Sequence, residues 1–273
     1  MVHLMRGQMA LRLSFVMLIF VGDLSAQALA ISHANVELIA EQNSLPLGKP
    51  LWVGLLFRLD PGWHIYWQNP GDSGEPPKVQ WQLPPGMSAG AIRWPQPIRL
   101  GSRTVVDYGY EGQVLLMAPI KGPTAGGSFS MSDLAADVKY IVCREMCIPG
   151  KAHLVLALPP GGDWTAWHLL FEQTKSQFPK PAPPNWNVSV TSDNAHFVVS
   201  VRASPPVNSA SFFPLEPGQI DNSSSQDFVS DPKGFRLTLK KSDQLTKPIS
   251  TLRGLIVLGP GRAFEVAAPV ASR

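Results

Sequence analysis

Proline and glycine recur along almost the whole chain, and no other feature limits its possible folds as much. The 273 residues include 27 prolines and 23 glycines, about 18% of the chain against roughly 12% in average usage. Both residues interrupt or weaken helices, so a long-helix or coiled-coil protein is excluded. Because 44% of the residues are hydrophobic, a packed core is expected. The composition therefore predicts an all-β protein of short strands and many turns.

Charge and motifs exclude several classes of function. The formal net charge is only +3, too small for a protein that coats nucleic acid, so no nucleic-acid partner is expected. We find no Ser/His/Asp order, no phosphate-binding glycine loop and no paired-carboxylate motif, which disfavours hydrolases and nucleotide-binding proteins. No cofactor is expected either.

The first 30 residues have the features of a secretory signal peptide. Arg6 and Arg12 precede an apolar run from Leu13 to Val21, and small residues with possible cleavage sites after Ala28 or Ala30 follow. The run is shorter than the roughly 20 residues of a membrane span, although an uncleaved anchor stays open. We expect a protein that is exported to the periplasm and soluble after cleavage, where disulfides can form.

The remaining sequence predicts two β units. Residues 31–158 predict an immunoglobulin-like β-sandwich, residues 159–185 a short helix with a proline-rich linker, and residues 186–273 a second, smaller β-sandwich domain. The helix is expected from Trp164 to about Phe178, with Asp163 as its cap. The predicted strands are Ala34–Ala40, Leu51–Leu59, Val114–Ile120, Asp137–Cys143, Ala152–Leu158, Asn187–Val190, His196–Val201, Phe235–Lys240, Leu252–Leu258 and Ala263–Val266.

The two cysteines, Cys143 and Cys147, carry the sharpest chemical signal. Positions four apart on one strand lie about 13 Å from each other, whereas a disulfide needs Cα atoms within about 7 Å. If the two are bonded, the chain must turn within Arg144–Met146. Since the residues before Cys143 favour a strand, we expect a hairpin in which Cys143 ends one strand and Cys147 begins the next.

Three uses of this pair stay open. A bridge that closes about five residues stabilises a fold by only about 2 kcal/mol in the chain-entropy model, and exposed local bridges are often labile, which favours a redox role. An inert structural clasp is the second possibility. A Cu(I) site is the third, since Cys143, Met146 and Cys147 offer three soft sulfur ligands.

Aromatic residues are dense in the segment 60–74. As a strand, it places Trp63, Ile65 and Trp67 on one face and His64 and Tyr66 on the other. We expect about half of these residues in the core and the others in an aromatic wall near the sulfurs. His64 is expected to pack or hydrogen bond rather than act as a base.

A second aromatic segment, 106–112, is interpreted as a loop that carries Tyr108 and Tyr110 exposed. Such a loop would act as a lid that shields a dithiol from stray oxidants and opens for a partner.

Together these segments resemble the periplasmic N-terminal domain of the thiol:disulfide interchange protein DsbD, in its ScsB-type copper-tolerance variant. The matching stretches, between about Trp52 and Leu158, are Pro61–Trp67, Asn69–Gly74, Ile92–Pro95, Tyr108–Tyr110, Val138–Cys143 and Cys147–Pro149.

The resemblance implies a sandwich whose cysteine pair relays electrons as a protein-disulfide reductase. A membrane-embedded thiol reductant would supply them, and exported thioredoxin-fold proteins or apocytochrome maturation factors would receive them, supporting disulfide isomerisation or cytochrome c maturation. It also implies that Tyr108 caps the pair and that Tyr66 lies beside it. The cysteines are closer in sequence than in the family, and no membrane domain follows up to residue 273, so the donor is expected to be a separate protein.

For the reaction we expect a partner thiolate to attack one sulfur and the remaining cysteine to resolve the mixed disulfide, with Cys147 in the resolving position. Whether the protein is itself an enzyme, of the thiol-disulfide oxidoreductase type, stays open.

Overall fold

The computed structural model describes residues 32–45, 49–101, 104–122, 134–158, 163–203 and 207–272. The predicted signal peptide (1–30) and the Pro-Gly break at 159–162 lie outside these residues. From Ser32 onward the chain forms one compact unit. In the described part, no helix combines the length and apolarity that crossing a membrane requires.

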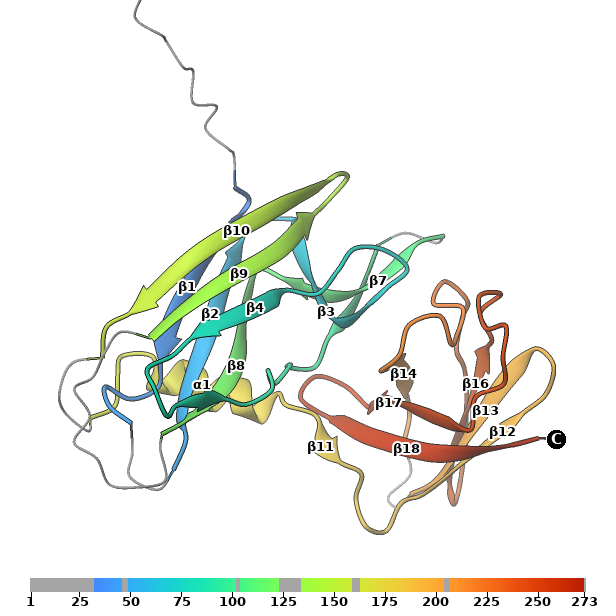
Figure 1. Cartoon of the computed structure of the whole chain (residues 1–273). Helices are drawn as coiled ribbons and strands as arrows, with labels where there is room; N and C mark the ends of the chain where they lie inside the picture. Colours follow the sequence, from blue (N-terminus) through green and yellow to red (C-terminus); the bar gives the residue numbers. More distant parts are fainter. Residues whose placement is uncertain are drawn as a thin grey trace, which may run out of the picture. The chain divides into compact units, whose positions relative to one another are not determined.

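The N-terminal half forms two facing sheets (Figure 1). One has the strand order β1-β2-β8-β5, and the other the order β10-β9-β3-β7-β6, with β4 paired to β9. The strands of the first are β1 (Ala34–Ala40), β2 (Leu51–Leu59), β5 (Ser88–Ala89) and β8 (Gln113–Lys121). Those of the second are β3 (His64–Gly71), β4 (Lys78–Gln82), β6 (Ile98–Gly101), β7 (Val106–Glu111), β9 (Leu134–Cys143) and β10 (Cys147–Leu156).

Alternating residues of both sheets fill the space between them. Leu55 and Phe57 of β2 pack in one cluster with Ile65 and Trp67 of β3, and all four side chains are at most 1% exposed. Trp63 joins this cluster, which confirms the predicted core face of the aromatic segment. The opposite face of β3 therefore carries His64 and Tyr66, away from that core.

The outer face of the β1-β2-β8-β5 sheet is covered by α1 (His168–Ser176), through Phe171 at 0% exposure. The helix is shorter than predicted, and the predicted cap is wrong, because the helix begins after Trp167. Residues 164 and 165 instead pair with the end of β1: Trp164 bridges Gln42, and Thr165 N donates to the carbonyl oxygen of residue 41.

The C-terminal half forms one curled sheet with the order β14-β17-β18-β12-β13-β16-β15, with β11 paired to β18. Its strands are β11 (Lys180–Pro181), β12 (Asn187–Ser192), β13 (His196–Arg202), β14 (Ser211–Pro214), β15 (Asp227–Asp231), β16 (Gly234–Lys240), β17 (Thr251–Val257) and β18 (Ala263–Ser272). β18 pairs with β17 along most of its length and with β12 at its last residues, so the sheet folds around a second core.

The two halves share hydrophobic packing. Leu252 and Ile256 of β17 belong to the second core, whereas Leu255 and Val257 of the same strand, with Phe213 of β14, belong to the first. From Gly254 to Val257, β17 is thus buried on both faces. The all-β fold with an immunoglobulin-like sandwich, a second β unit and one short helix is confirmed, while the domain boundaries at 158 and 186 stay a prediction.

Candidate redox site

The two cysteines close the β9–β10 hairpin. Cys143 and Cys147 are paired in the strand register, their Cα atoms lie 4.1 Å apart, and their sulfurs form a disulfide. In the three-residue loop between them, Arg144 N donates a hydrogen bond to the carbonyl oxygen of Met146. The predicted hairpin is therefore confirmed, and the bond lies at its tip.

The two sulfurs differ in accessibility. Cys143 is 2% exposed because β9 lies between β10 and β3, where its register partner is His64. Cys147 is exposed, since it begins β10 at the edge of the sheet. Because Cys147 is the more exposed residue, we expect a visiting thiolate to attack its sulfur and Cys143 to act as the resolving residue, opposite to the order expected from sequence.

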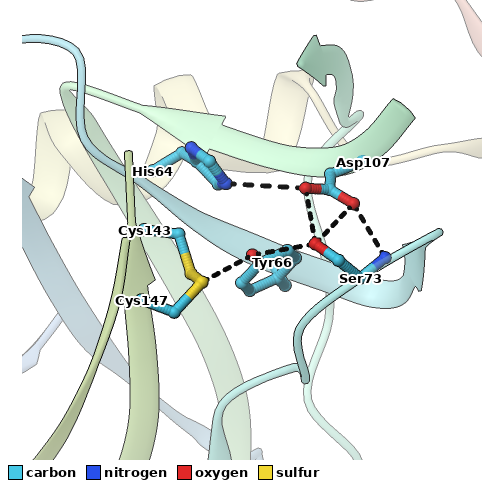
Figure 2. Close-up of a disulfide and its surroundings, with 6 residues drawn as sticks. All are labelled: His64, Tyr66, Ser73, Asp107, Cys143 and Cys147. Carbon is cyan, nitrogen blue, oxygen red and sulfur yellow. Dashed lines mark hydrogen bonds and ion pairs between the residues drawn. A yellow bond between two sulfur atoms is a disulfide. The ribbon is translucent and has the colours of Figure 1, made fainter. Parts of the chain in front are cut away.

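A hydroxyl group lies beside the exposed sulfur. Tyr66 Oη is 3.6 Å from Cys147 Sγ and 3.4 Å from Ser73 Oγ (Figure 2). The Ser73 hydroxyl has one hydrogen, which points to the two carboxylate oxygens of Asp107 at 3.0 and 2.9 Å, and Ser73 N also donates to Asp107 at 2.9 Å. Ser73 is therefore an acceptor toward Tyr66, and the Tyr66 hydrogen is shared between Ser73 Oγ and the sulfur.

Burial keeps both ring side chains of the site neutral. It raises the pKa of Tyr66, as the charge of Asp107 also does, against the opposing effect of the hydrogen bond with Ser73. It lowers the pKa of His64, against the raising effects of Asp107 and Glu111. At neutral pH, Tyr66 is therefore a hydrogen-bond donor and His64 an uncharged imidazole, whose Nε2 lies 3.9 Å from Asp107, too far for a hydrogen bond.

A turn, Asp72–Gly74, lies over Tyr66, and we call it the covering segment. Gly74 has a φ of +68°, and a Cβ atom built there would be 2.1 Å from Cζ of the Tyr66 ring. Only glycine allows the backbone to lie this close to the ring while adopting that conformation. The covering segment therefore fixes the ring whose hydroxyl faces the sulfur.

Tyr108 and Tyr110 do not cover the disulfide. They lie in β7, at 0% and 6% exposure, and their rings pack in the first core. The Tyr108 hydroxyl donates to Asn222 Oδ1 and that of Tyr110 to the carbonyl oxygen of Pro95, each at 2.8 Å. The predicted exposed loop is wrong because residues 106–111 form a strand. Its side chains alternate between the core, which contains Tyr108 and Tyr110, and the opposite face, where Asp107 lies at the site.

Of the predicted aromatic residues, the structure thus brings Tyr66 and His64 to the cysteines. Sequence reasoning assigned no role to Ser73 or Asp107. Two sequence features could have drawn attention to them: the turn sequence Asp72-Ser73-Gly74, and the acidic residue that precedes Tyr108. Only pairing of β3 with β7 brings the two stretches together.

Two groups of described residues offer potential metal ligands. Met146 is 66% exposed beside the pair, but the thiolates that Cu(I) prefers exist only after the disulfide is reduced. Elsewhere, Glu41, His168 and Glu172 have ligand atoms within 4.8 Å of one another. Lys175 Nζ donates to both carboxylates, at 2.7 and 2.8 Å, so an ammonium group already balances part of the negative charge of this cluster.

Replacing Tyr66 with phenylalanine is expected to raise the thiol pKa of Cys147 in the reduced protein by about half a unit to one unit. The hydroxyl donates more strongly to a thiolate than to a thiol, and one hydrogen bond corresponds to a shift of this size. The pH profile of Cys147 alkylation by iodoacetamide, followed by peptide mass spectrometry, measures it. Tyr140→Phe, which removes a hydroxyl from the core face of the same hairpin, is the control. An unchanged profile for Tyr66→Phe would show that the hydroxyl does not act on the sulfur.

Comparisons with known proteins find a match for the segment that carries this site. The model described as "Thiol:disulfide interchange protein DsbD, N-terminal" matches residues 36–159. The crystal structure of the N-terminal periplasmic domain of ScsB from Proteus mirabilis superimposes with a TM-score of 0.69 at 19% identity, covering 88% of this chain and 94% of that one.

Two other structures, the periplasmic chaperone SfaE and a protein of unknown function from Porphyromonas gingivalis W83, share 11% and 13% identity. The matches cover 88% and 87% of this chain and the full length of each of the two structures. Their TM-scores of 0.22 are too low to indicate a shared fold. Among curated proteins none matches the chain in sequence. The segment 36–159, which contains both cysteines and every residue of the site, therefore resembles the N-terminal domains of the thiol:disulfide interchange protein DsbD in sequence, and the chain shares the fold of the ScsB domain.

Proposed function

We propose that this protein is an exported thiol:disulfide interchange relay that works through Cys143 and Cys147. The observation that carries the proposal is an exposed cysteine, Cys147, bonded to a buried one, Cys143, within a short hairpin, with the Tyr66 hydroxyl 3.6 Å from Cys147 Sγ. The match of residues 36–159 to the DsbD N-terminal family model supports thiol:disulfide interchange as the chemistry. Export is supported by the sequence of residues 1–30 and by the periplasmic description of the ScsB domain.

Reduction of the bridge would take two exchange steps. A thiolate of a membrane-embedded dithiol donor attacks Cys147 Sγ, the bond between the cysteines breaks, and Cys143 leaves as a thiolate. The second thiolate of the donor then attacks its own sulfur in the mixed disulfide and releases Cys147. The donor becomes a disulfide, and the hairpin gains two electrons.

Transfer onward reverses these steps on an acceptor disulfide. The Cys147 thiolate attacks one acceptor sulfur, and the other acceptor sulfur leaves as a thiolate. Cys143 then attacks Cys147 Sγ, which re-forms the bridge and releases the acceptor fully reduced. The acceptors we propose are exported thioredoxin-fold proteins or apocytochrome maturation factors. Tyr66 donates a hydrogen bond to the sulfur of Cys147 in the two steps in which this sulfur is a thiolate. These are its release from the donor and its attack on the acceptor.

Equilibration with reduced and oxidised glutathione tests the proposal. We expect a reduction potential between about −270 and −180 mV, the range from thioredoxin to protein disulfide isomerase. Acid quenching and alkylation give the reduced fraction at each ratio. A potential below about −300 mV, with no mixed disulfide formed by the native protein, would instead identify the bridge as an inert clasp.

A further inference from the structure

A residue of the C-terminal half reaches the covering segment. Asn222, in the connection between β14 and β15, is 5% exposed, and both ends of its amide are used. Its Nδ2 donates to Asp72 Oδ1 at 2.7 Å, and its Oδ1 accepts from the Tyr108 hydroxyl at 2.8 Å. One side chain therefore joins the first residue of the covering segment to the C-terminal half.

The turn that presents Asn222 is held firmly in its own half. The Asp221 carboxylate accepts hydrogen bonds from the backbone N–H groups of Ser223 and Ser224 at 3.0 and 3.1 Å, from both of their hydroxyls, and from Lys240 Nζ at 2.8 Å. These bonds, that from Lys240 foremost, hold the pKa of Asp221 well below its usual range, so it stays ionised. From the N-terminal half, Arg99 of β6 donates a further hydrogen bond to the carbonyl oxygen of Asn222. The amide is thus placed by a rigid support.

At the other end, each residue of the covering segment holds one part of the site. Asp72 Oδ2 accepts from Val106 N at 2.8 Å, and Asp72 N donates to the Val106 carbonyl oxygen at 3.1 Å. Ser73 bonds Asp107 and faces the Tyr66 hydroxyl, and Gly74 lies on the Tyr66 ring. A bond at Asp72 therefore acts on the position of the hydroxyl beside Cys147.

We infer that Asn222 is a positioning residue for the exchange reaction: by holding Asp72, it keeps the covering segment closed on Tyr66 and so keeps the Tyr66 hydroxyl at Cys147 Sγ. The role in exchange rests on the proposed function, whereas the positioning itself can be tested on this protein without any partner. It assigns a task to the C-terminal half, which supports the redox hairpin from outside the matched family segment.

A reciprocal swap of two side chains tests this inference. Asn222→Asp keeps an acceptor for the Tyr108 hydroxyl but turns the donor that faces Asp72 into a second carboxylate. In the reduced protein we expect the rate of Cys147 alkylation by iodoacetamide at neutral pH to fall about threefold to tenfold, the effect of one hydrogen bond. The pH profile should move upward, as for Tyr66→Phe. Adding Asp72→Asn to Asn222→Asp places a donor at position 72 opposite an acceptor at position 222. The amide oxygen of the new side chain at position 72 can still accept from Val106 N. The double variant should therefore restore the rate.

Gln226→Ala is the matched control, because Gln226 bonds only the backbone of Phe212 in the same half, at 2.7 and 2.8 Å. It should leave the alkylation profile of Cys147 unchanged. Thermal unfolding of each variant checks folding, and Asn222→Ala replaces Asn222→Asp if the latter does not fold.

A folded Asn222 variant with the native alkylation profile would overturn the inference, and so would a slowed rate that the reciprocal swap leaves slow. Neither result bears on whether the native protein exchanges disulfides with a partner. Conversely, a native protein that shows the expected alkylation effects but forms no mixed disulfide would overturn the proposed function alone.

Discussion

Replacing Cys143 with alanine is expected to convert a transient mixed disulfide into a stable one, whereas replacing Cys147 is expected to prevent the mixed disulfide from forming. The reason is the difference in accessibility between the two sulfurs, since Cys143 is 2% exposed and Cys147 lies exposed at the hairpin tip. Without Cys143, no thiolate remains to attack the bond between Cys147 and the partner. In both variants, net electron transfer should fall to the background of the variant that lacks both cysteines.

Non-reducing electrophoresis after incubation with oxidised glutathione or with an oxidised thioredoxin-fold protein measures the trapped product. Both single variants should remain folded, because a bridge that closes so short a loop stabilises the fold by only about 2 kcal/mol. Adducts that form equally well through either cysteine would contradict the proposed order of attack. Wild-type electron transfer by either single variant would contradict a relay that needs both sulfurs.

Truncation of Phe213 to alanine is expected to lower the free energy of unfolding by about 3–5 kcal/mol, the usual cost of removing a buried phenylalanine. Phe213 comes from the C-terminal half, is 4% exposed and packs against Tyr108 and Trp67, at ring distances of 5.1 and 6.5 Å. Beside it, Asn69 Nδ2 donates to the carbonyl oxygen of Pro214 at 2.7 Å. Because the first core includes this residue, we expect both halves to lose stability together.

Urea unfolding followed by tryptophan fluorescence and by far-ultraviolet circular dichroism measures this effect. Val229→Ala, at a side chain that is 48% exposed, is the control and should change the free energy by no more than about 0.5 kcal/mol. Two separate transitions, with the N-terminal one unchanged by Phe213→Ala, would show that the shared packing does not couple the halves.

Local pattern was enough to predict much of this structure. Strands 34–40 and 51–59 have the predicted bounds, since alternating or continuous apolar residues between turn residues leave few other conformations. The hairpin at Cys143 and Cys147 followed from the reach of a disulfide, and the two faces of the 63–67 strand from its period of two. Each of these rests on residues close in sequence.

The errors concern residues whose environment lies far away in the chain. Tyr108 was predicted in an exposed cap, but its hydroxyl finds Asn222, 114 residues later, which makes burial in the core favourable. Asp163 was predicted to cap a helix, yet the chain there pairs with the end of β1. The order of attack at the cysteines stays a prediction, but the exposure that favours attack at Cys147 depends on which strand is at the edge of the sheet, which the sequence does not reveal.

The sequence by itself was enough to predict the strand-rich architecture and two cysteines at the tip of one hairpin, because turn residues, side-chain periodicity and bond lengths act over a few residues. The expectation of export also rests on the sequence alone. Only the tertiary structure decided which sulfur is open to a partner, which hydroxyl faces it, and that Ser73, Asp107 and Asn222 hold that hydroxyl. These contacts join segments that are far apart in the chain, some from the N-terminal and some from the C-terminal half, and hydrogen bonds between residues 34 to 150 positions apart have no signature in a local pattern.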